Sequence, residues 1–461
     1  MTKDYRIESD TLGEVKVPKD ALWGAQTGRS RHNFPTGPLM PVWVIKALIN
    51  VKLAAAKVNA AEGELNQHRA DLIEQAAEKL LNLSDADLMK DFPLHVYQTG
   101  SGTQTNMNVN EVLAHVANQI DPEAKILPND DVNYSQSSND TFPTAMNIAG
   151  LKAVQQLLPE LERLIEVFDQ LSQKYWDVVK IGRTHLQDAT PLTFGQEISG
   201  WSSTLKHDVS FIKMNANGLL DLPIGGTAVG TGLNAEIGFD QAMVTELGQI
   251  YGEKFKVENK FYGLAAHTAL TNTHGAISTL ATDLMKISND IRFLASGPRA
   301  GYGEISIPAN EPGSSIMPGK VNPTQTEAMT MAATRIMGNN TTIEVANSQG
   351  NFEMNVYKPV IIATFIESVE LLIGLLPNYT DKLVAGIQVN EQEMKKLVDK
   401  SLMTVTALSP YIGYHNAASI AQLAMKEGLN LREAAVQSGF LSATDFDKWV
   451  DPLKMTNNQR K

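Results

Sequence analysis

The chain has 461 residues, of which 43% are hydrophobic and 20% charged, which is typical of a globular protein with about three domains. Its 39 basic and 51 acidic residues give a net charge of −12, which argues against a nucleic-acid-binding or anionic-membrane-binding surface. Cysteine is absent, so disulfides, cysteine nucleophiles, thiolate zinc sites and iron–sulfur clusters are excluded.

The N-terminal residues 1–10 have no apolar core of the signal-peptide type, so we expect a cytoplasmic protein. No uninterrupted apolar run approaches the roughly 18 residues that span a bilayer. Residues 360–376 come closest, but Glu367 and Glu370 interrupt them. This segment is therefore predicted to be a buried helix.

The first predicted element is a small hairpin, because residues 5–17 alternate weakly around Leu12 and Gly13. From Ile45 onward the apolar residues take helical spacing. The clearest helix lies within residues 266–296, where two apolar seams repeat every seven residues. Such seams let long helices pack side by side. The seams consist of Leu270, Ile277, Leu284 and Ile291, and of Leu280, Ile287 and Leu294.

Further long stretches of helical periodicity predict a central helix bundle in a mainly all-α fold. They cover residues 144–176, 194–212, 324–346 and 359–376. After residue 390 the segments shorten, which predicts a small C-terminal helical domain. Residues 431–450 look like a helix-turn-helix but carry mixed charges, which argues against DNA binding. The expected domains are residues 1–134, 135–390 and 391–461.

Four segments rich in Ser, Thr, Asn and Gly interrupt the helical pattern, and each is predicted to lead into a helix start. A helix N-terminus exposes unpaired backbone N–H groups and the positive end of the helix dipole. One such segment alone would be an ordinary capped turn. Four together, with a lysine and a histidine, favour a site for a small, multiply charged anion such as a dicarboxylate. The segments are residues 99–106, 135–143, 182–191 and 311–323.

The fourth segment carries the most information. Asn322 and Pro323 are predicted to be the N-cap and the first residue of a helix, with Glu327 in or just past its first turn. Lys320 precedes the helix, so its ammonium and the helix dipole can act on one anion. A phosphate-binding P-loop is excluded, because five residues separate the two glycines and Val321 stands where Ser or Thr is required. The glycine-rich residues 225–232 lack a dinucleotide-fold context and are predicted to form a turn.

Among the histidines, His185 is the candidate for proton transfer, because it lies in a run dense in polar groups. His267 and His274 are seven residues apart, but no third ligand or HExxH arrangement accompanies them. No metal site is therefore expected. Asp130 and Asp131 need no ion if they form a turn.

Residues 313–323 are similar to the signature loop of the fumarase/aspartase superfamily. Within it, the chain resembles the class II fumarate hydratases over nearly its whole length, from residues 20–27 onward. This closer resemblance rests on residues 137–146, on residues 182–185 and on Gly319. Aspartases typically have glutamine in place of His185 and alanine in place of Gly319.

The resemblance implies three domains with a long central helix bundle, and a homotetramer in which each active site combines segments from three subunits. It also implies reversible hydration of fumarate to L-malate, a reaction of the tricarboxylic acid cycle, by anti addition of water through a carbanion-like state. No metal or organic cofactor is expected. The only partners expected are the dicarboxylate substrate and further copies of the chain, without nucleic acid or membrane.

The resemblance also implies roles for individual residues. Ser314 matches the proton-abstracting base, and its oxyanion would need backbone N–H groups and Lys320 to stabilise it. Lys320 and Asn322 match the groups that hold the substrate carboxylate and its charge-rich intermediate. His185, paired with Glu327, would handle the added or departing water. The expected substrate contacts are Ser101, Gly102, Thr103, Ser137, Ser138, Asn139, Thr184, Ser315, Lys320, Val321 and Asn322.

A second dicarboxylate site of the family corresponds to Leu127, Pro128, Asn129 and Asp130. The family often has histidine at the place of Leu127 and a basic residue three positions earlier, where this chain has Ala124. We therefore expect this second site to bind weakly.

Two other functions stay open from the sequence. One is aspartate ammonia-lyase or another superfamily lyase, such as argininosuccinate or adenylosuccinate lyase. The other is a non-catalytic scaffold, as lens crystallins are in a sister branch. The joint presence of Ser314, His185, Lys320 and Glu327 argues against the scaffold.

Overall fold

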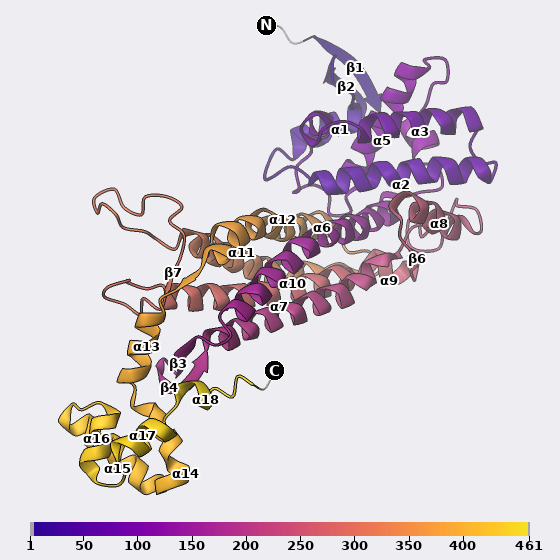
Figure 1. The fold of residues 1–461 in the computed structure, drawn as a ribbon. Coiled ribbons are helices and arrows are strands. Elements are labelled where there is room, and N and C mark those ends of the chain that lie inside the picture. The colour runs from indigo at the N-terminus through magenta and orange to yellow at the C-terminus, as the bar shows by residue number, and fades with distance from the viewer. Residues whose placement is uncertain (1–3, 460–461) are drawn as a thin grey trace. The chain divides into compact units, whose positions relative to one another are not determined.

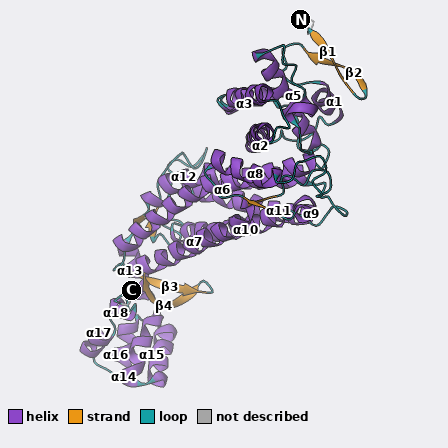
Figure 2. Ribbon diagram, turned by 90° about the vertical axis from the view of Figure 1, so that its right-hand side faces the viewer, coloured by secondary structure: helices purple, strands orange, loops and turns teal. Residues whose placement is uncertain are grey.

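Helices dominate the computed structural model, which describes residues 4–459 (Figures 1 and 2). Within that range the β-strands form four two-stranded sheets. The mainly all-α fold expected from the apolar periodicity is therefore confirmed. The strands are β1 (Tyr5–Asp10), β2 (Gly13–Pro18), β3 (Val179–Thr184), β4 (Gln187–Thr193), β5 (Asp221–Leu222), β6 (Lys256–Val257), β7 (Ile305–Ser306) and β8 (Gln388–Val389).

Five helices are long, and the predicted periodic stretches all fall on them. These are α6 (Ser138–Lys174), α7 (Phe194–Ala216), α10 (Thr268–Leu294), α11 (Thr324–Asn347) and α12 (Lys358–Lys382). The helices before α10 are α1 (Ala25–Asn33), α2 (Val42–Ala61), α3 (Gln67–Leu81), α4 (Asp85–Leu88), α5 (Thr103–Ile120), α8 (Phe239–Tyr251) and α9 (Lys260–Ala265). Those after α12 are α13 (Glu391–Lys400), α14 (Ser409–Ile412), α15 (Tyr414–Glu427), α16 (Leu431–Ser438), α17 (Ala443–Trp449) and α18 (Pro452–Met455).

The predicted N-terminal hairpin is confirmed. Strands β1 and β2 pair antiparallel, with Asp10 opposite Gly13. Gly13 has a φ of 109°, which glycine adopts at little cost because it has no Cβ. The Gly13 that marked the turn in the sequence thus closes it in the structure.

The chain divides into two compact units, each made of three stretches. The first unit takes residues up to 158, 210–281 and 334–372, and the second takes 159–209, 282–333 and the residues from 373 onward. All the boundaries fall inside the five long helices. The division into domains 1–134, 135–390 and 391–461 stays a prediction.

In the first unit, the long helices pack through a buried polar contact as well as through apolar side chains. His274 on α10 forms hydrogen bonds with Asn340 on α11 at 2.9 Å and with Ser368 on α12 at 2.8 Å. The Phe365 ring lies 5.8 Å from the His274 ring. The three helices therefore lie side by side here, as the bundle prediction requires.

In the second unit, continuations of the same helices pack together. Trp201 on α7 donates to Asp290 on α10 at 3.1 Å, and its ring lies 5.8 Å from that of Phe168 on α6. Ser288 on α10 and Tyr379 on α12 share a hydrogen bond of 2.9 Å. Helical periodicity thus predicted the packing of these helices in both units.

Helix α12 is long and apolar enough to cross a membrane by length and composition alone. Its apolar side chains are nevertheless packed inside the protein, with Ile361, Phe365 and Val369 all at 0% exposure. Helix α12 is therefore a core helix, as predicted for residues 360–376.

The C-terminal helices surround a small core of their own, which includes Leu408, Ile420, Leu431 and Phe446. The Asn430 side chain accepts from the backbone N–H of Glu433, whose side chain accepts from the Asn430 backbone. This capping box begins α16. The helix-turn-helix look of residues 431–450 thus corresponds to α16, a turn and α17.

A buried carboxyl pair in the second unit makes stability depend on pH. Asp208 on α7 is 2% exposed and shares a hydrogen bond with Asp283 on α10. Burial and the charge of Asp283 raise the pKa of Asp208 from 3.8 to about 7. The folded protein therefore binds a proton that the unfolded chain releases, so stability falls as pH rises toward 7. We expect a loss of roughly 3 kcal/mol between pH 5 and pH 8 from this group.

The variant Asp208→Asn tests this dependence. The amide keeps a hydrogen bond to Asp283 but carries no titrating proton. The unfolding free energy of the variant should therefore fall less between pH 5 and pH 8 than that of the wild type. Urea unfolding of both proteins across this range measures the difference. Parallel curves for the two proteins would contradict the assignment.

Candidate active site

Two of the predicted polar segments meet in the first unit. Helix α5 begins at Thr103 and α6 begins at Ser138, so both segments lead into helix starts as predicted. The Thr103 hydroxyl shares hydrogen bonds with Ser101 at 2.8 Å and with Ser138 at 2.7 Å. Three hydroxyls thus form a connected cluster beside two helix N-termini, an arrangement suited to a carboxylate.

Two glycines allow the tip of α5 to lie close to its neighbours. Gly102 is the N-cap of α5 with a φ of 81°, and a Cβ there would lie 2.3 Å from the Phe142 ring. A Cβ on Gly100 would lie 1.4 Å from the carbonyl oxygen of Val356. The position of the Ser101 and Thr103 hydroxyls therefore depends on residues without side chains at 100 and 102.

Asp140 holds the second polar segment, residues 135–143, in place through hydrogen bonds to the backbone. Its carboxylate accepts from the backbone N–H of Ser137 at 3.0 Å, of Gly225 at 2.9 Å and of Thr227 at 3.0 Å. Burial raises the pKa of Asp140, although these donors oppose the rise. Asn139 donates to the carbonyl of Ala228 at 2.8 Å. The glycine-rich residues 225–232, predicted to be only a turn, thus support the expected substrate-binding residues 137–139.

The third polar segment does not lead directly into a helix, so that prediction is wrong. Thr184 ends β3, and His185 and Leu186 form the turn to β4, each with a φ of 57°. Two residues with positive φ are typical of the turns that match the twist of a hairpin. Thr184 and His185 are therefore exposed at a hairpin tip.

An ion pair supports this hairpin in the second unit. Arg183, next to Thr184, donates to Glu304 at 2.6 Å, and the Glu304 side chain is 0% exposed. The Arg183 guanidinium also lies 4.3 Å from the centre of the Tyr302 ring. Sequence patterns do not predict this pair, because its partners are 121 residues apart.

In the signature loop, Ser314 is surrounded by backbone donors. Its Oγ accepts from the N–H groups of Ile316 at 3.2 Å and of Met317 at 3.0 Å. The loop is closed by a hydrogen bond of 2.9 Å from Gly313 N–H to the Lys320 carbonyl. Two donors aimed at one hydroxyl oxygen stabilise its anionic form more than its neutral form.

Asn322 has a different contact from the one predicted. Helix α11 begins at Thr324, and the carbonyl of Pro323 accepts from Glu327 N–H at 3.1 Å. Asn322 is therefore not the N-cap, and Pro323 precedes the first helical residue. Instead the Asn322 side chain donates to the Gly313 carbonyl at 2.6 Å and accepts from the Lys320 ammonium. It joins the two ends of the loop.

The remaining expected residues of this loop are open to solvent. Ser315, Lys320 and Val321 are exposed, and so is Glu327, which lies in the first turn of α11 as predicted. Within residues 4–459 of one chain, Glu327 forms no hydrogen bond or ion pair with His185. The pairing of these two side chains stays a prediction.

The region of the second dicarboxylate site contains a cavity of about 430 Å³ in the first unit. Leu127, Pro128 and Asn129 line it, together with Arg6 and His115. Asp130 instead lines a separate cavity of about 760 Å³, which Asn129 also borders.

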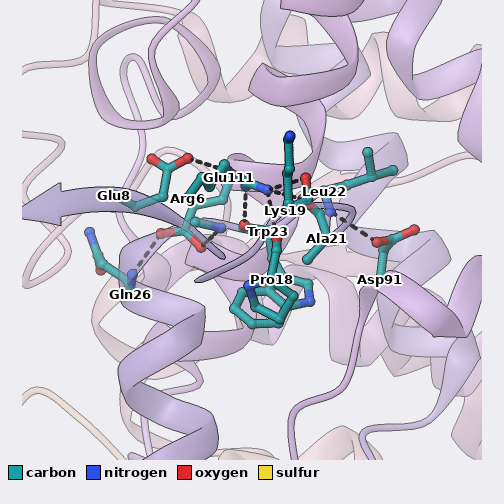
Figure 3. Close-up of polar contacts among 11 residues, drawn as sticks. Arg6, Glu8, Pro18, Lys19, Ala21, Leu22, Trp23, Gln26, Asp91 and Glu111 are labelled. Carbon is teal, nitrogen blue, oxygen red and sulfur yellow. Dashed lines mark hydrogen bonds and ion pairs between the residues drawn. The ribbon is translucent and has the colours of Figure 1, made fainter. Parts of the chain in front are cut away.

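The two basic groups of this cavity are poorly suited to hold an anion. The Arg6 guanidinium donates to Glu8 and to the carbonyls of Pro18, Lys19, Ala21 and Trp23 (Figure 3). Burial and the neighbouring Arg6 charge lower the pKa of His115, which favours its neutral form. Both observations support the expectation of weak binding at this second site.

Two of the residues considered as metal ligands, His274 and Asp131, have other partners. Both ring nitrogens of His274 are hydrogen-bonded to Asn340 and Ser368. Asp131 receives two hydrogen bonds of 2.6 Å from Arg69. Across the described part of the chain, no three His, Asp or Glu side chains gather as a metal site would require.

Comparison with known families places these observations in context. Residues 13–338 match the family described as "Lyase", and residues 405–457 match the family described as "Fumarase C C-terminus". The first match includes every residue of the predicted site.

The chain is 55% identical over 455 residues to "Fumarate hydratase class II" of Listeria monocytogenes, covering 98% of this chain and 99% of the relative. It is 52% identical over 459 residues to the protein of that name from Bacillus subtilis, with the same coverage. The crystal structure of the class II fumarase from Schistosoma mansoni matches with a TM-score of 0.95 and 42% identity, over 98% of this chain and 99% of that one. The chain therefore belongs to the class II fumarases of the fumarase/aspartase superfamily.

Proposed function

We propose that the chain catalyses the reversible hydration of fumarate to L-malate, in the cytoplasm, as a homotetramer without a metal or organic cofactor. The observation that carries this proposal is the Ser314 hydroxyl, which accepts two backbone N–H bonds in the loop that also contains Lys320 and Asn322. The full-length relatives named fumarate hydratase support the choice of reaction.

The chemical difficulty of the reaction is the removal of a weakly acidic proton beside a carboxylate. In the direction of dehydration, Ser314 acts as its oxyanion, takes the proton from the carbon of malate that lies next to the hydroxyl-bearing carbon, and becomes the neutral hydroxyl. The electron pair of the broken C–H bond stays on the substrate, which becomes carbanion-like. The N–H groups of Ile316 and Met317 make the Ser314 oxygen available as an anion, and the Lys320 ammonium stabilises the added charge on the substrate.

The second step removes water from the opposite face. The carbanion electron pair forms the double bond of fumarate, and the C–O bond breaks as the departing hydroxide takes a proton from His185. Glu327 would orient and charge the imidazole, as a carboxylate partner does for a catalytic histidine. In the assembly we propose, each site takes its segments from three subunits, and His185 meets Glu327 there.

The hydroxyl cluster of the first unit binds a substrate carboxylate in this proposal. Ser101, Thr103 and Ser138 provide connected hydroxyl donors, and the N-terminus of α6 adds backbone donors and a favourable dipole. Ser137 and Asn139 complete the group. The binding requires no charged side chain at the surface of this cluster.

Ultraviolet absorbance of the fumarate double bond tests the reaction directly. Purified protein should make absorbance fall when fumarate and water are supplied, and rise when L-malate is supplied. Aspartate offered in parallel should give no signal. A signal with aspartate alone would identify an ammonia-lyase, and no signal with any of the three would contradict catalysis of either reaction.

A further inference from the structure

Lys358 is a buried ammonium for which the catalytic proposal has no role. Its side chain is 0% exposed, and no protein group within residues 4–459 accepts a hydrogen bond from its Nζ. An unpaired buried charge costs free energy, because it loses the stabilisation of water and receives no equivalent partner. Its presence at the first residue of α12 therefore requires an explanation beyond packing.

The surroundings of Lys358 connect it with the two segments that carry the hydroxyl cluster, at the N-termini of α5 and α6. Its backbone N–H donates to the carbonyl of Gly100 at 3.1 Å, which fixes the residues that lead into Ser101. Burial lowers the pKa of Lys358 to about 8, although its ammonium lies close enough to Asp140 for that carboxylate to oppose the fall. Asp140 in turn holds the backbone of Ser137. Lys358 thus contacts one segment of the cluster and interacts electrostatically with the support of the other.

The charges around Lys358 do not balance. Asp140 faces two buried ammonium groups, those of Lys358 and Lys52. The third titratable neighbour, His267, carries no negative charge, and burial and Lys358 lower its pKa to about 3, so that it is neutral. Burial lowers the pKa of Lys52 to about 7 and that of Lys358 to about 8. Below pH 7 both lysines are therefore ammonium groups, and one carboxylate leaves one positive charge unmatched.

We propose that Lys358 is a positioning residue of the dicarboxylate site, whose buried ammonium supplies the positive charge behind the hydroxyl tips of α5 and α6. The hydroxyls and backbone N–H groups contact the substrate carboxylate. The buried Lys358 ammonium does not contact this carboxylate but stabilises its negative charge electrostatically. This inference rests on the proposed function. It explains how the hydroxyl cluster, which has no charged group of its own, binds one carboxylate of a dianion, and why an unpaired charge is kept in the core.

The isosteric variant Lys358→Met tests the proposal through two measurements: its stability should rise and its affinity for the substrate should fall. The protein should become more stable, because an unpaired buried charge is replaced by an apolar side chain. The KM for fumarate and for L-malate should rise by about tenfold, the effect of one charge acting over roughly 10 Å at an effective dielectric constant near 20. The kcat should change much less. Lower stability or an unchanged KM in this variant would overturn the proposal.

Lys52→Met is the matched control for stability. Lys52 belongs to the same charge cluster and is also 0% exposed, but its ammonium donates to Asn133 and Gln136 at 2.9 Å each. Its removal takes a charged donor from both side-chain oxygens, of which only that of Asn133 keeps other donors, Asn106 and Asn110, so this variant should be less stable than the wild type. A gain in stability at both positions would show that pairing is not what distinguishes Lys358.

Binding of succinate and monomethyl succinate, measured by calorimetry, separates a charge effect from a packing effect without requiring turnover. Lys358→Met should weaken succinate binding by about tenfold and monomethyl succinate binding by less. An equal loss for both ligands would indicate displaced hydroxyls and overturn the electrostatic role. Wild-type protein that binds succinate but does not turn over fumarate would refute the proposed function while leaving this inference testable.

Discussion

Replacing Ser314 with alanine should lower kcat for fumarate hydration and malate dehydration by about 10²–10⁴-fold, the range expected when a general base is lost. The Ser314 hydroxyl accepts from two backbone N–H groups, at 3.2 and 3.0 Å. These donors stabilise an oxyanion more than a neutral hydroxyl, and alanine offers them no acceptor. The fumarate absorbance assay measures the loss in both directions.

A second serine variant controls for the mutation itself. Ser419 lies on the exposed surface of α15 in the same unit and donates to the carbonyl of His415 at 2.9 Å. Ser419→Ala should therefore keep the wild-type kcat. Melting temperature and elution volume should be the same for both variants and the wild type. If Ser314→Ala keeps kcat within about twofold, well below the contribution of a general base, Ser314 is not the base.

The long helices could be predicted from sequence because their signal is local and repeats. In α10, the apolar residues at seven-residue spacing, such as Leu270 and Ile277, are all buried, none with more than 4% exposure. The starts of α5 at Thr103 and of α6 at Ser138 could be predicted for the same reason, since small polar residues precede each apolar run. Local signals thus identified the elements and three of the four helix starts, the third being that of α11, one residue later than predicted.

The hairpin that carries His185 had no such signal. Its two turn residues are His185 and Leu186, both at a φ of 57°. Hairpin turns of this kind usually contain Asn or Gly, which can be recognised in a sequence. The one-residue error at α11 has a related cause. Asn322 has the side chain of an N-cap, but its hydrogen bonds close the signature loop instead.

The supporting contacts of the site could not be predicted, because they join residues far apart in the chain. Asp140 accepts from Gly225 and Thr227, 85 and 87 residues away. Lys358 and Lys52 stand in segments that are otherwise apolar, where a single lysine gives no sign of whether its ammonium is buried or reaches solvent. Only the fold reveals that all these charges belong to one cluster.

The contact between Glu304 and Arg183 could not be predicted from the sequence either. Replacement of Glu304 should have the largest effect on stability. Glu304→Leu leaves the charge of Arg183 without its partner in a largely buried place, since the two side chains are 0% and 13% exposed. We expect the free energy of unfolding to fall by about 3–5 kcal/mol, as when one partner of a buried ion pair is removed. Urea unfolding of both proteins measures this loss.

The activity of Glu304→Leu should also fall, because Arg183 immediately precedes Thr184 and His185 in the hairpin. The exposed pair Arg432 and Asp447 offers a matched control in the same unit. Asp447→Asn removes a carboxylate that accepts two hydrogen bonds from Arg432, yet it should change the melting temperature little, because water compensates for the loss at the surface.

The double variant Arg183→Met with Glu304→Leu decides whether the unpaired charge is the cause. It removes both charges and should be more stable than Glu304→Leu alone, because no buried ion remains without a partner. Additive losses would instead mean that each side chain contributes by packing alone. If charge pairing holds the hairpin, the double variant should recover stability while its kcat stays low, because the guanidinium that anchors the strand before His185 is then absent.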